Sequence, residues 1–489
     1  MNAKFLLIPV ALAGLAGCND MLTETPRAAV VTETFFKTGA DAKAAIASAY
    51  QPLNTGNLFG TNLQWATIAG ADEGFIGKDE ENINIINLTR TNWDATNGYV
   101  TGPWTGFYTI VTRANLILEK VPEIPMDEAQ QTQVLAEAKF LRAFSYYDLV
   151  RLYGDVPLVT TTEEQTVLAP RTPKEQVWAQ IIKDATEAEA GLPATWGTAD
   201  KGRATKGSAD ALLADAYLWR SSAEGSNEWQ KAADAAKKVI DSGVYSLEPN
   251  YINAFLPGSQ NRKEEVFAVQ ATAAAGGSTV TIAGWAWPRE MGAGSPGGWG
   301  TYVPTQSLLN LYPTGDYRKE VSYFTHGPDP KGKDVTFYQE HVYKWRPSTR
   351  PGPEDVNWPV YRYAEVLLIY AEAQNELGNQ AVAAQYVNMV RARARKGTGS
   401  ENRAAPADIV AGDKTAMRTA IDTERRIELA MEGKRWFDLV RRGADYFKAQ
   451  ETANDPTSVA ANLTAAKLLW PVPQSQIDLN PNLTQNPGY

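Results

Sequence analysis

Two neighbouring segments of this chain carry apolar residues at the spacing of an α-helix, and this pattern constrains the fold most strongly. In residues 203–220 and again in residues 227–243, apolar side chains fall at positions i, i+3, i+4 and i+7, so each segment has one apolar helix face. The positions are Ala209, Leu212, Leu213 and Ala216 in the first segment and Trp229, Ala232, Ala233 and Ala236 in the second. Because most of these side chains are small and only a short turn separates the segments, we predict a closely packed pair of helices.

A second pair is predicted over residues 361–378 and 380–395. The stripe in its first member consists of Ala364, Leu367, Leu368 and Ala371. Two helices joined by a short turn resemble a tetratricopeptide hairpin. The pairs are degenerate and scattered along the chain, so we expect helical hairpins wrapped into one body and not a long open solenoid.

Further helices are expected over residues 40–53, 103–121, 136–154 and 172–193. Pro103 suits the first turn of the second of these helices. Thr172, followed by Pro173 and Glu175, is close to a capping box at the start of the last one. The fold class predicted from these segments is mostly α.

Two irregular regions interrupt the helical pattern. Residues 55–100 contain one strand-like run, at 82–89, and residues 250–358 contain another, at 264–271, together with most of the Gly and Pro of the chain. The chain therefore reads as a helical scaffold that carries two loop-rich insertions. Because binding residues concentrate in loops positioned by a rigid scaffold, we expect the function to lie in these insertions.

The N-terminus has the pattern of an export signal. A positively charged start precedes an apolar run at residues 5–17, which is too short to span a bilayer as a helix. We predict a signal peptide over residues 1–17. Cys18, the one cysteine of the chain, follows at once, and the sequence Leu15–Cys18 resembles a bacterial lipobox, which would make Cys18 the lipid-modified first residue of the mature protein. With a single cysteine no intramolecular disulfide can form.

Composition and charge exclude several classes of function. The formal net charge is −9 and no basic cluster occurs, which argues against nucleic-acid binding. There are two histidines, His326 and His341, and no HExxH, CxxC, GxSxG or P-loop sequence, so metal chemistry, including zinc chemistry, and thiol chemistry are not indicated, nor is a cofactor.

Acidic residues in the C-terminal part favour a structural interpretation. Glu424, Glu428 and Glu432 recur every four residues among Arg425, Arg426 and Arg435, a spacing typical of intrahelical ion pairs. A glycosidase needs two carboxylates about 5–10 Å apart in a cleft, and the sequence does not establish such a pair.

Seven of the tryptophans lie in the irregular regions, three of them in residues 284–302. These are Trp285, Trp287 and Trp299, in a stretch where six glycines and two prolines disfavour regular structure. Sugar rings present flat C–H faces surrounded by hydroxyls, so exposed aromatic planes with polar neighbours are typical of sugar-binding sites. We predict a ligand site from these residues with Trp93, Tyr302, Asp72 and Arg289. Arg346, beside Trp345, is a further candidate. The alternative is that each tryptophan side chain folds back and packs against the protein near its own loop.

Six segments, taken in order, resemble the SusD/RagB family of surface lipoproteins. They are residues 32–50, 137–159, 203–219, 360–378, 424–443 (as one helix) and 469–489, and they cover nearly the whole chain after Cys18. The resemblance implies a single SusD-like domain over residues 18–489, with an N-terminal helical part (18–250), a loop-rich ligand-binding insertion (251–358) and a C-terminal helical part (359–489). It also implies four tetratricopeptide-like units.

The function that the resemblance implies is non-enzymatic capture of an oligosaccharide or another nutrient. The protein would be lipid-anchored in the outer membrane, facing the exterior, and would deliver its ligand to a SusC-like TonB-dependent β-barrel transporter. Two alternatives stay open: a surface glycoside hydrolase on an all-helical scaffold, and a structural partner of the barrel with no ligand pocket. The identity of the glycan does not follow from the sequence.

Overall fold

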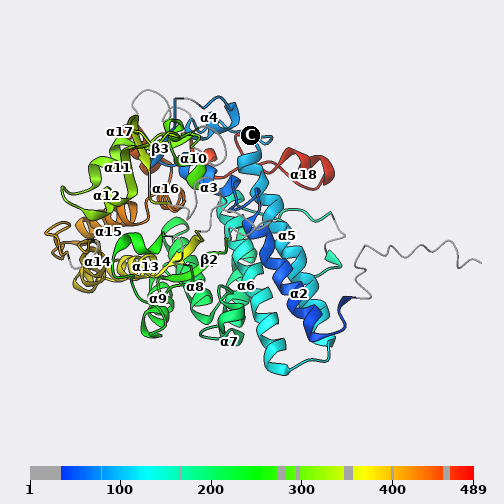
Figure 1. Cartoon of the computed structure of the whole chain (residues 1–489). Coiled ribbons are helices and arrows are strands. Elements are labelled where there is room, and N and C mark those ends of the chain that lie inside the picture. The colour runs from blue at the N-terminus through cyan, green and yellow to red at the C-terminus, as the bar shows by residue number, and fades with distance from the viewer. Residues whose placement is uncertain are drawn as a thin grey trace, which may run out of the picture.

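The computed structural model of the chain describes residues 35–78, 80–164, 168–256, 258, 260–271, 282–292, 298–345, 356–397, 401–454 and 463–489 (Figure 1). The predicted signal peptide, Cys18 and Arg346 lie outside these residues. No helix of the described part is both long enough and apolar enough to cross a membrane.

Long helices form a continuous scaffold in which each packs on the next (Figure 1). Helix α2 packs on α5, and the sequence continues through α6, α7, α8 and α9 to α13 and α14, with α15 against the last two. The bounds are α2 (Gly39–Tyr50), α5 (Gly98–Lys120), α6 (Glu128–Tyr153), α7 (Lys174–Gly191), α8 (Lys206–Ala223), α9 (Trp229–Asp241), α13 (Tyr363–Glu376), α14 (Gln380–Ala394) and α15 (Lys414–Glu428). The mostly α fold class is confirmed.

Both predicted helix pairs are present, α8 with α9 and α13 with α14. The apolar stripes that predicted them are buried, including Leu212 in α8, Ala233 in α9 and Leu367 in α13, except that Trp229 at the start of α9 is half-buried. Because α9 packs on α13, the two pairs are adjacent in space although more than a hundred residues separate them in the chain. The loop-rich insertion leaves the scaffold after the first pair and returns at the second.

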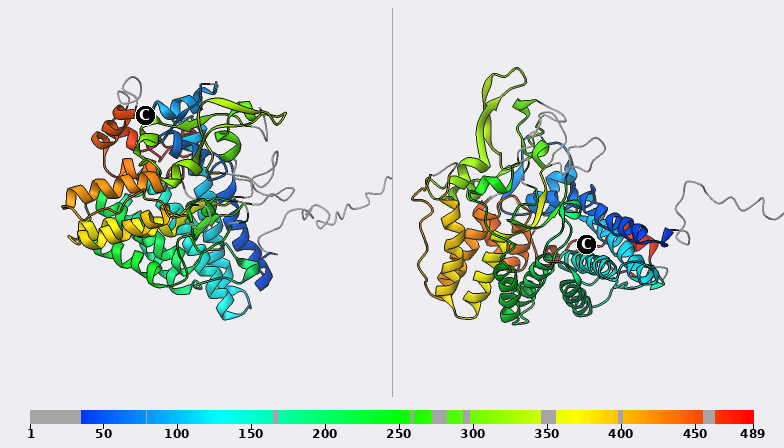
Figure 2. Two further views of the ribbon diagram at one scale, coloured as in Figure 1. Left: turned by 60° about the vertical axis from the view of Figure 1, so that its left-hand side comes forward. Right: turned by 60° about the horizontal axis from the view of Figure 1, so that its bottom comes forward.

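Most of the shorter helices gather with β3 above the scaffold in Figure 1, whereas β2 lies among the scaffold helices. The described strands form three two-stranded antiparallel sheets. The sheets pair β1 with β3, β2 with β6 and β4 with β5, and the β4–β5 hairpin projects from the body (Figure 2). The strands are β1 (Gly74–Ile76), β2 (Glu265–Val269), β3 (Tyr302–Pro304), β4 (Tyr323–Pro328), β5 (Asp334–Val342) and β6 (Trp358–Arg362). The helices are α3 (Asn62–Ala69), α4 (Ile83–Thr89), α10 (Ile282–Ala286), α11 (Gln306–Leu311), α12 (Tyr317–Ser322), α16 (Arg435–Val440), α17 (Ala444–Asn454) and α18 (Gln474–Leu479).

Predictions for the irregular regions succeed in one case and fail in the other. The strand expected at 264–271 is β2, but the strand expected at 82–89 is wrong because these residues form α4. The Asn82 side chain accepts a hydrogen bond from the backbone N–H of Asn84 at 3.0 Å and caps this helix. Ile85 and Leu88 are buried and lie three residues apart, on one face of this helix. The alternating Asn and Ile residues therefore also contain an apolar pair at helical spacing.

Two helix starts also differ from expectation. Helix α5 begins five residues before Pro103, with Asn97 as its cap, so the proline lies inside the helix. Helix α7 has no capping box: its N-cap is Pro173, and the Thr172 hydroxyl accepts instead from the backbone N–H of Leu158 at 3.2 Å. A hydrogen bond to a neighbouring segment thus replaces the local cap at the start of α7, whereas Asn97 caps α5 locally by accepting from the backbone N–H of Tyr99 at 3.0 Å.

The helix expected over 424–443 is interrupted. Helix α15 ends at Glu428, the backbone turns at Met431 with a φ of 62°, and α16 begins at Arg435. Glu424, Glu428 and Glu432 therefore do not pair along one helix, and the intrahelical interpretation is wrong although they do form ion pairs.

The partners of these three glutamates come from distant segments. Their carboxylates are buried and contact Arg318 of α12, Lys344 after β5, Arg362 at the end of β6, and Arg391 and Arg393 of α14. We call this set, with Asp316 and Glu264, the buried charge network.

Candidate functional site

A groove of about 510 Å³ lies beside strand β1. Strand β1 pairs with β3 in antiparallel register, from Gly74 opposite Pro304 to Ile76 opposite Tyr302. Helix α4, the start of α11 and Glu451 of α17 complete its walls. This volume falls within the range of about 300–1,000 Å³ typical of ligand pockets. We call it the β1 groove.

Phe75 lines the β1 groove, and two further exposed aromatic side chains belong to segments that meet β1 beside it. Phe75 of β1 is 41% exposed, Tyr338 of β5 is 38% exposed, and Trp299, before β3, is 37% exposed. The three segments meet at Gly77, whose backbone N–H donates to Thr301 O at 2.7 Å. A Cβ at Gly77 would lie 2.0 Å from Gly300 O and 3.2 Å from the Tyr338 hydroxyl, so only glycine permits this approach.

Trp299 is the outer member of a stack of three indoles. Its ring lies on Trp285 with centroids 5.2 Å apart and planes inclined by 30°, and Trp285 in turn meets the edge of buried Trp65 at 5.1 Å. The Trp299 backbone is fixed by two bonds, from its N–H to Gly284 O and from Arg289 Nε to its carbonyl, both at 2.9 Å. The Trp299 backbone is therefore held in place and its side chain is partly exposed, while Trp285, on which it packs, is half-buried.

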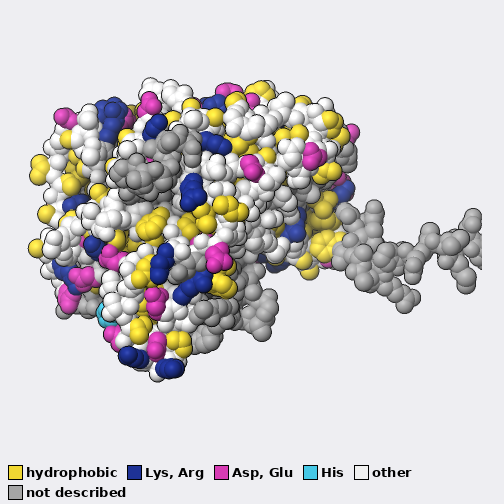
Figure 3. Space-filling model, turned by 90° about the horizontal axis from the view of Figure 1, so that it is seen from above, with side chains coloured by type: hydrophobic (Ala, Val, Ile, Leu, Met, Phe, Trp, Pro, Cys, Tyr) yellow, Lys and Arg dark blue, Asp and Glu magenta, His cyan; other side chains and the backbone are white. Residues whose placement is uncertain are grey.

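Polar side chains line the rest of the β1 groove. Arg90, at the end of α4, and Gln306, at the start of α11, are exposed, and Glu80 is half-buried. Glu80 Oε1 accepts from the backbone N–H groups of Glu81 and Asn82 at 3.1 and 2.8 Å, which fixes its carboxylate. Lys78 Nζ lies 4.4 Å from the centre of the Tyr338 ring. This face of the molecule is seen in Figure 3, where hydrophobic side chains are exposed among Lys, Arg, Asp and Glu side chains.

Three of the predicted site residues are buried in the structure, so the expectation that their side chains contact a ligand directly is wrong for this conformation of the protein. Trp93 packs edge-on against Trp436, and its Nε1 donates to the Tyr489 hydroxyl at 2.8 Å. Trp287 is buried in the core. Asp72 is fully buried and accepts from Arg435 Nε at 2.8 Å.

The remaining predictions have mixed outcomes. Trp285, Trp299 and Arg289 contact one another, but none of the three is among the described residues that line the β1 groove, so their role in binding stays a prediction. Tyr302 belongs to β3, but its side chain is outside what the structure describes. Phe75 and Tyr338 were missed by the sequence analysis. Successive side chains of a strand point to opposite faces, so in the adjacent pair Phe337 and Tyr338 one aromatic ring had to face outward, and this could have pointed to Tyr338. In the structure Phe337 is buried and Tyr338 is exposed.

A buried carboxyl lies directly beneath the groove. Burial raises the pKa of Glu73 to about 8, and its Oε2 accepts from the backbone N–H of Met431 at 3.1 Å. The Glu73 carbonyl also accepts from Thr305 N at 3.0 Å, so this residue ties β1 to α11 and to the α15–α16 turn. Its role is structural because its side chain is fully buried.

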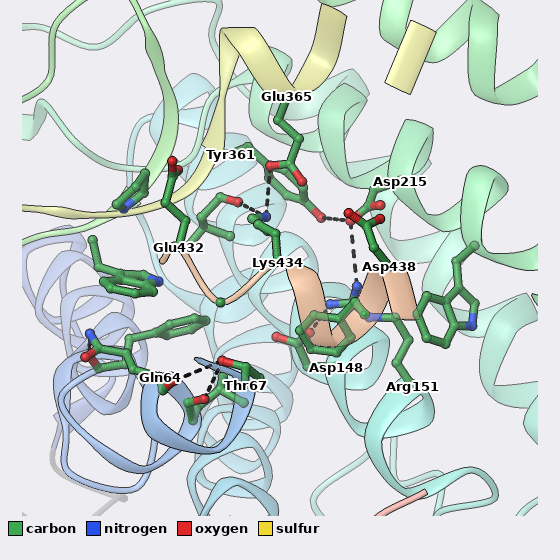
Figure 4. A pocket seen from close by; sticks show the side chains of 18 of the residues that line it. Gln64, Thr67, Asp148, Arg151, Asp215, Tyr361, Glu365, Glu432, Lys434 and Asp438 are labelled. Atoms are coloured by element: carbon green, nitrogen blue, oxygen red, sulfur yellow. Dashed lines mark hydrogen bonds and ion pairs between the residues drawn. The ribbon is translucent and has the colours of Figure 1, made fainter. Parts of the chain in front are cut away.

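A second cavity, shown in Figure 4, is too small for a sugar. It has a volume of about 50 Å³ and lies between α3, α6, α8, β6 and α16. Polar side chains of its walls bind one another: the Tyr361 hydroxyl donates to Asp215 at 3.1 Å, and Lys434 forms an ion pair with Glu365 at 2.9 Å. Such a volume suits a few water molecules and not a ligand.

Neither histidine lines the β1 groove. His341 is buried with Nδ1 3.2 Å from Ala286 O, and His326 on β4 lies 3.2 Å from Asp334. Among the described residues no group of three or more His, Cys, Asp or Glu side chains is placed to hold a metal ion.

Two family models match the chain. The model described as "SusD family" matches residues 327–489, and the model described as "Starch-binding associating with outer membrane" matches residues 31–218. Each match covers a part of the chain that contains scaffold helices, and the first also contains Tyr338.

Individual relatives match over almost the full length. SusD-like protein P2 of Formosa agariphila is 32% identical over 518 residues, which span 98% of this chain and 98% of that protein. The crystal structure of a SusD homolog from Bacteroides thetaiotaomicron superposes with a TM-score of 0.83 over 94% of this chain and 98% of that chain, at 22% identity. A laminarin binding SusD-like protein superposes with a TM-score of 0.75 over 93% and 100%, at 26% identity. The fold and the near-complete match to P2 show that this chain belongs to the SusD/RagB family.

Proposed function

We propose that this protein captures an oligosaccharide at the β1 groove and delivers it to a SusC-like TonB-dependent transporter of the outer membrane, without making or breaking a bond. The observation that carries the proposal is a polar groove lined by exposed Phe75, at which the segments of two more exposed aromatic residues, Trp299 and Tyr338, meet at Gly77. The family description as starch-binding and the laminarin-binding relative support a glycan as the ligand.

The chemistry of the groove suits a sugar. The ring faces match the C–H faces of pyranose rings, and Arg90, Glu80 and Gln306 supply donors and acceptors for hydroxyls. If each ring buries about 60–100 Å² against sugar, it contributes roughly 1.5–2.5 kcal/mol. After association costs of several kcal/mol, three rings give micromolar-to-millimolar affinity, which permits release to a transporter.

Membrane attachment and partner belong to the same proposal. A lipid on Cys18, exposed after removal of residues 1–17, would anchor the chain to the outer membrane, facing the exterior. The helical scaffold would face the barrel, and the insertion, predicted as residues 251–358, would face the ligand. The residues that line the β1 groove come from 69–90 as well as from this insertion, so under this proposal the ligand-binding part would extend beyond the predicted boundaries.

Alanine substitution tests the proposal. Phe75→Ala, Trp299→Ala and Tyr338→Ala should together abolish retardation in native gels that contain the bound polysaccharide, with little change in the melting temperature because the rings are exposed. Leu479→Ala, at a 71% exposed apolar residue of α18, is the control. Unchanged retardation of the triple variant would refute the β1 groove as the binding site.

The same preparation distinguishes binding from hydrolysis. Glu80 and Glu451 both line the β1 groove, and a glycoside hydrolase would need a carboxylate pair. We expect no new reducing ends on prolonged incubation with the polysaccharide. Sustained release of reducing ends would establish the hydrolase alternative instead.

A further inference from the structure

A second and larger groove, of about 730 Å³, lies on the helical side of the molecule. It runs between the turn that joins α8 to α9, the end of α13, helix α15 and helix α17, at the left of Figure 1. We call it the α15 groove. Nothing in the capture of a glycan at the β1 groove requires it.

Hydroxyl groups line the two sides of the α15 groove. Thr415, Thr419 and Thr423 are four residues apart on α15, so they form one row along a single helix face. Ser221 and Ser222, at the end of α8, also line it. Rows of side-chain hydroxyls can donate to and accept from a polyhydroxylated ligand.

The charged groups of the α15 groove are held in place and balanced. Arg418 Nε and Nη2 donate to the two carboxylate oxygens of Glu376 at 2.5 and 2.6 Å. Arg442 Nη1 lies 2.9 Å from Asp422, which also accepts from the Tyr446 hydroxyl at 2.5 Å. Because each of these guanidinium groups faces a carboxylate, the groove favours a neutral polar ligand over an anionic one.

An aromatic ring and a further arginine also line the α15 groove. Trp229, half-buried at the start of α9, lines the groove and offers an indole face. Arg426 also lines the groove, and its buried Nε has no hydrogen-bond partner among the described residues. Aromatic, hydroxyl and guanidinium groups in one groove are the composition that also marks the β1 groove.

The two grooves are neighbours. Gln450 and Glu451, consecutive in α17, line the α15 groove and the β1 groove respectively. Arg426, which lines the α15 groove, is bonded to residues next to those that line the β1 groove: its Nη2 donates to the Asp72 carbonyl and to the Ser307 hydroxyl, both at 2.6 Å. A glycan chain that leaves the β1 groove past α17 therefore meets the α15 groove next.

We propose that the α15 groove is a second subsite for a neutral oligosaccharide, and that it binds the continuation of a chain held in the β1 groove. The proposal rests on the function proposed above. It predicts that the subsite contributes to the affinity for long chains and not to that for short ones.

Two variants test the second subsite. Trp229→Ala removes the indole face, and Thr419→Trp fills the groove from an exposed helix position. Thr105→Trp, at an exposed threonine of α5, is the matched control. Affinities are measured by calorimetry for laminarin and laminaritriose and for soluble starch and maltotriose, with Phe75→Ala as the variant of the β1 groove.

We expect Trp229→Ala and Thr419→Trp each to weaken binding of the polymer about tenfold and to leave the trisaccharide unchanged, while Phe75→Ala weakens both. If Trp229→Ala does not fold, Thr419→Trp decides. Wild-type polymer affinity in both variants, with Phe75→Ala still impaired, would overturn this inference alone. Loss of co-purification with an outer-membrane transporter at unchanged glycan affinity would overturn it in favour of a protein partner. If neither polymer binds the wild-type chain, the proposed function fails together with it.

Discussion

Neutralising Glu428 should destabilise the protein far more than its sequence context indicates. Glu428 accepts ion pairs from Arg318 at 3.0 Å, from Arg362 at 3.1 Å and from Arg393, and all four side chains are buried. The variant Glu428→Gln keeps the size of the side chain and removes its charge. It leaves three buried guanidinium groups with one carboxylate fewer.

The expected loss of stability follows from the burial of Glu428 among guanidinium groups. Burial alone would raise the pKa of Glu428, but the guanidinium groups of Arg393, Arg362 and Arg318 outweigh it and hold the pKa at about 2. The fall from the ordinary value of 4.5 corresponds to about 3 kcal/mol of stabilisation at neutral pH. Removal of one partner from a buried ion pair costs a similar amount, about 3–5 kcal/mol. An exposed intrahelical pair would cost only about 0.3–0.5 kcal/mol.

Equilibrium unfolding in urea at pH 7 measures this difference. We expect Glu428→Gln to lower the free energy of unfolding by about 3 kcal/mol. Glu187→Gln, which removes a half-exposed partner of Lys139, is the control and should change it by less than about 1 kcal/mol. Because the pKa is depressed in the folded state, the stabilisation is complete above about pH 4.5 and is lost as the pH falls towards 2, so the two proteins should converge in acid. Equal stabilities of Glu428→Gln and Glu187→Gln at pH 7 would refute the buried charge network.

Three further perturbations have defined outcomes. Gly77→Val should weaken glycan binding at least tenfold in calorimetry, because the side chain collides with the backbone of the opposite segment, whereas Gly98→Ala, with open space around its Cβ, should bind normally. Between about pH 4.5 and pH 8 the folded wild-type protein holds a proton on Glu73 that the unfolded chain releases, so its free energy of unfolding should fall as the pH rises, and Glu73→Gln should remove this fall. The same pH dependence of the free energy of unfolding in both proteins from about pH 5 to 9 would contradict the raised pKa. Trp93→Phe should lower the free energy of unfolding by about 1–3 kcal/mol, because the Tyr489 hydroxyl loses its buried donor, and should leave glycan affinity unchanged.

The scaffold could be predicted from the sequence because its signal is local. In α8 and α13 the residues that recur at helical spacing are all buried, as predicted, although both helices are buried on nearly all sides and the spacing alone did not indicate this. The break after Glu428 could not be seen in this way. Glu432 continues the four-residue spacing, yet it lies beyond the turn at Met431 because Lys344 and Arg362 bind it there.

The candidate site was predicted less well because exposure in a loop depends on distant segments. Trp287 and Trp299 lie twelve residues apart in the same glycine-rich stretch, but one is buried and the other is exposed. Trp287 lies beside Tyr343, next to β5, whereas Trp299 ends a stack based on α3. Neither partner can be inferred from the local sequence. Phe75 was missed for a related reason, since a three-residue strand is too short to show alternation.

The buried charge network also connects the scaffold to the ligand-binding part. Arg318 precedes β4, Lys344 follows β5 and Arg362 ends β6, and all three are bound by glutamates of α15 and of the turn after it. These contacts fix both ends of the β4–β5 hairpin, which carries Tyr338 at the edge of the β1 groove.

A glycan contacts three rings from separate segments, so its affinity depends on how well those segments are held relative to one another. We therefore expect Glu428→Gln to weaken glycan binding several-fold under conditions where the variant is still fully folded by circular dichroism. Glu187→Gln, far from the hairpin ends, should bind as the wild type does. Unchanged affinity in folded Glu428→Gln would mean that the network stabilises the fold without positioning the hairpin, and the three rings would then owe their arrangement to the Gly77 contact alone.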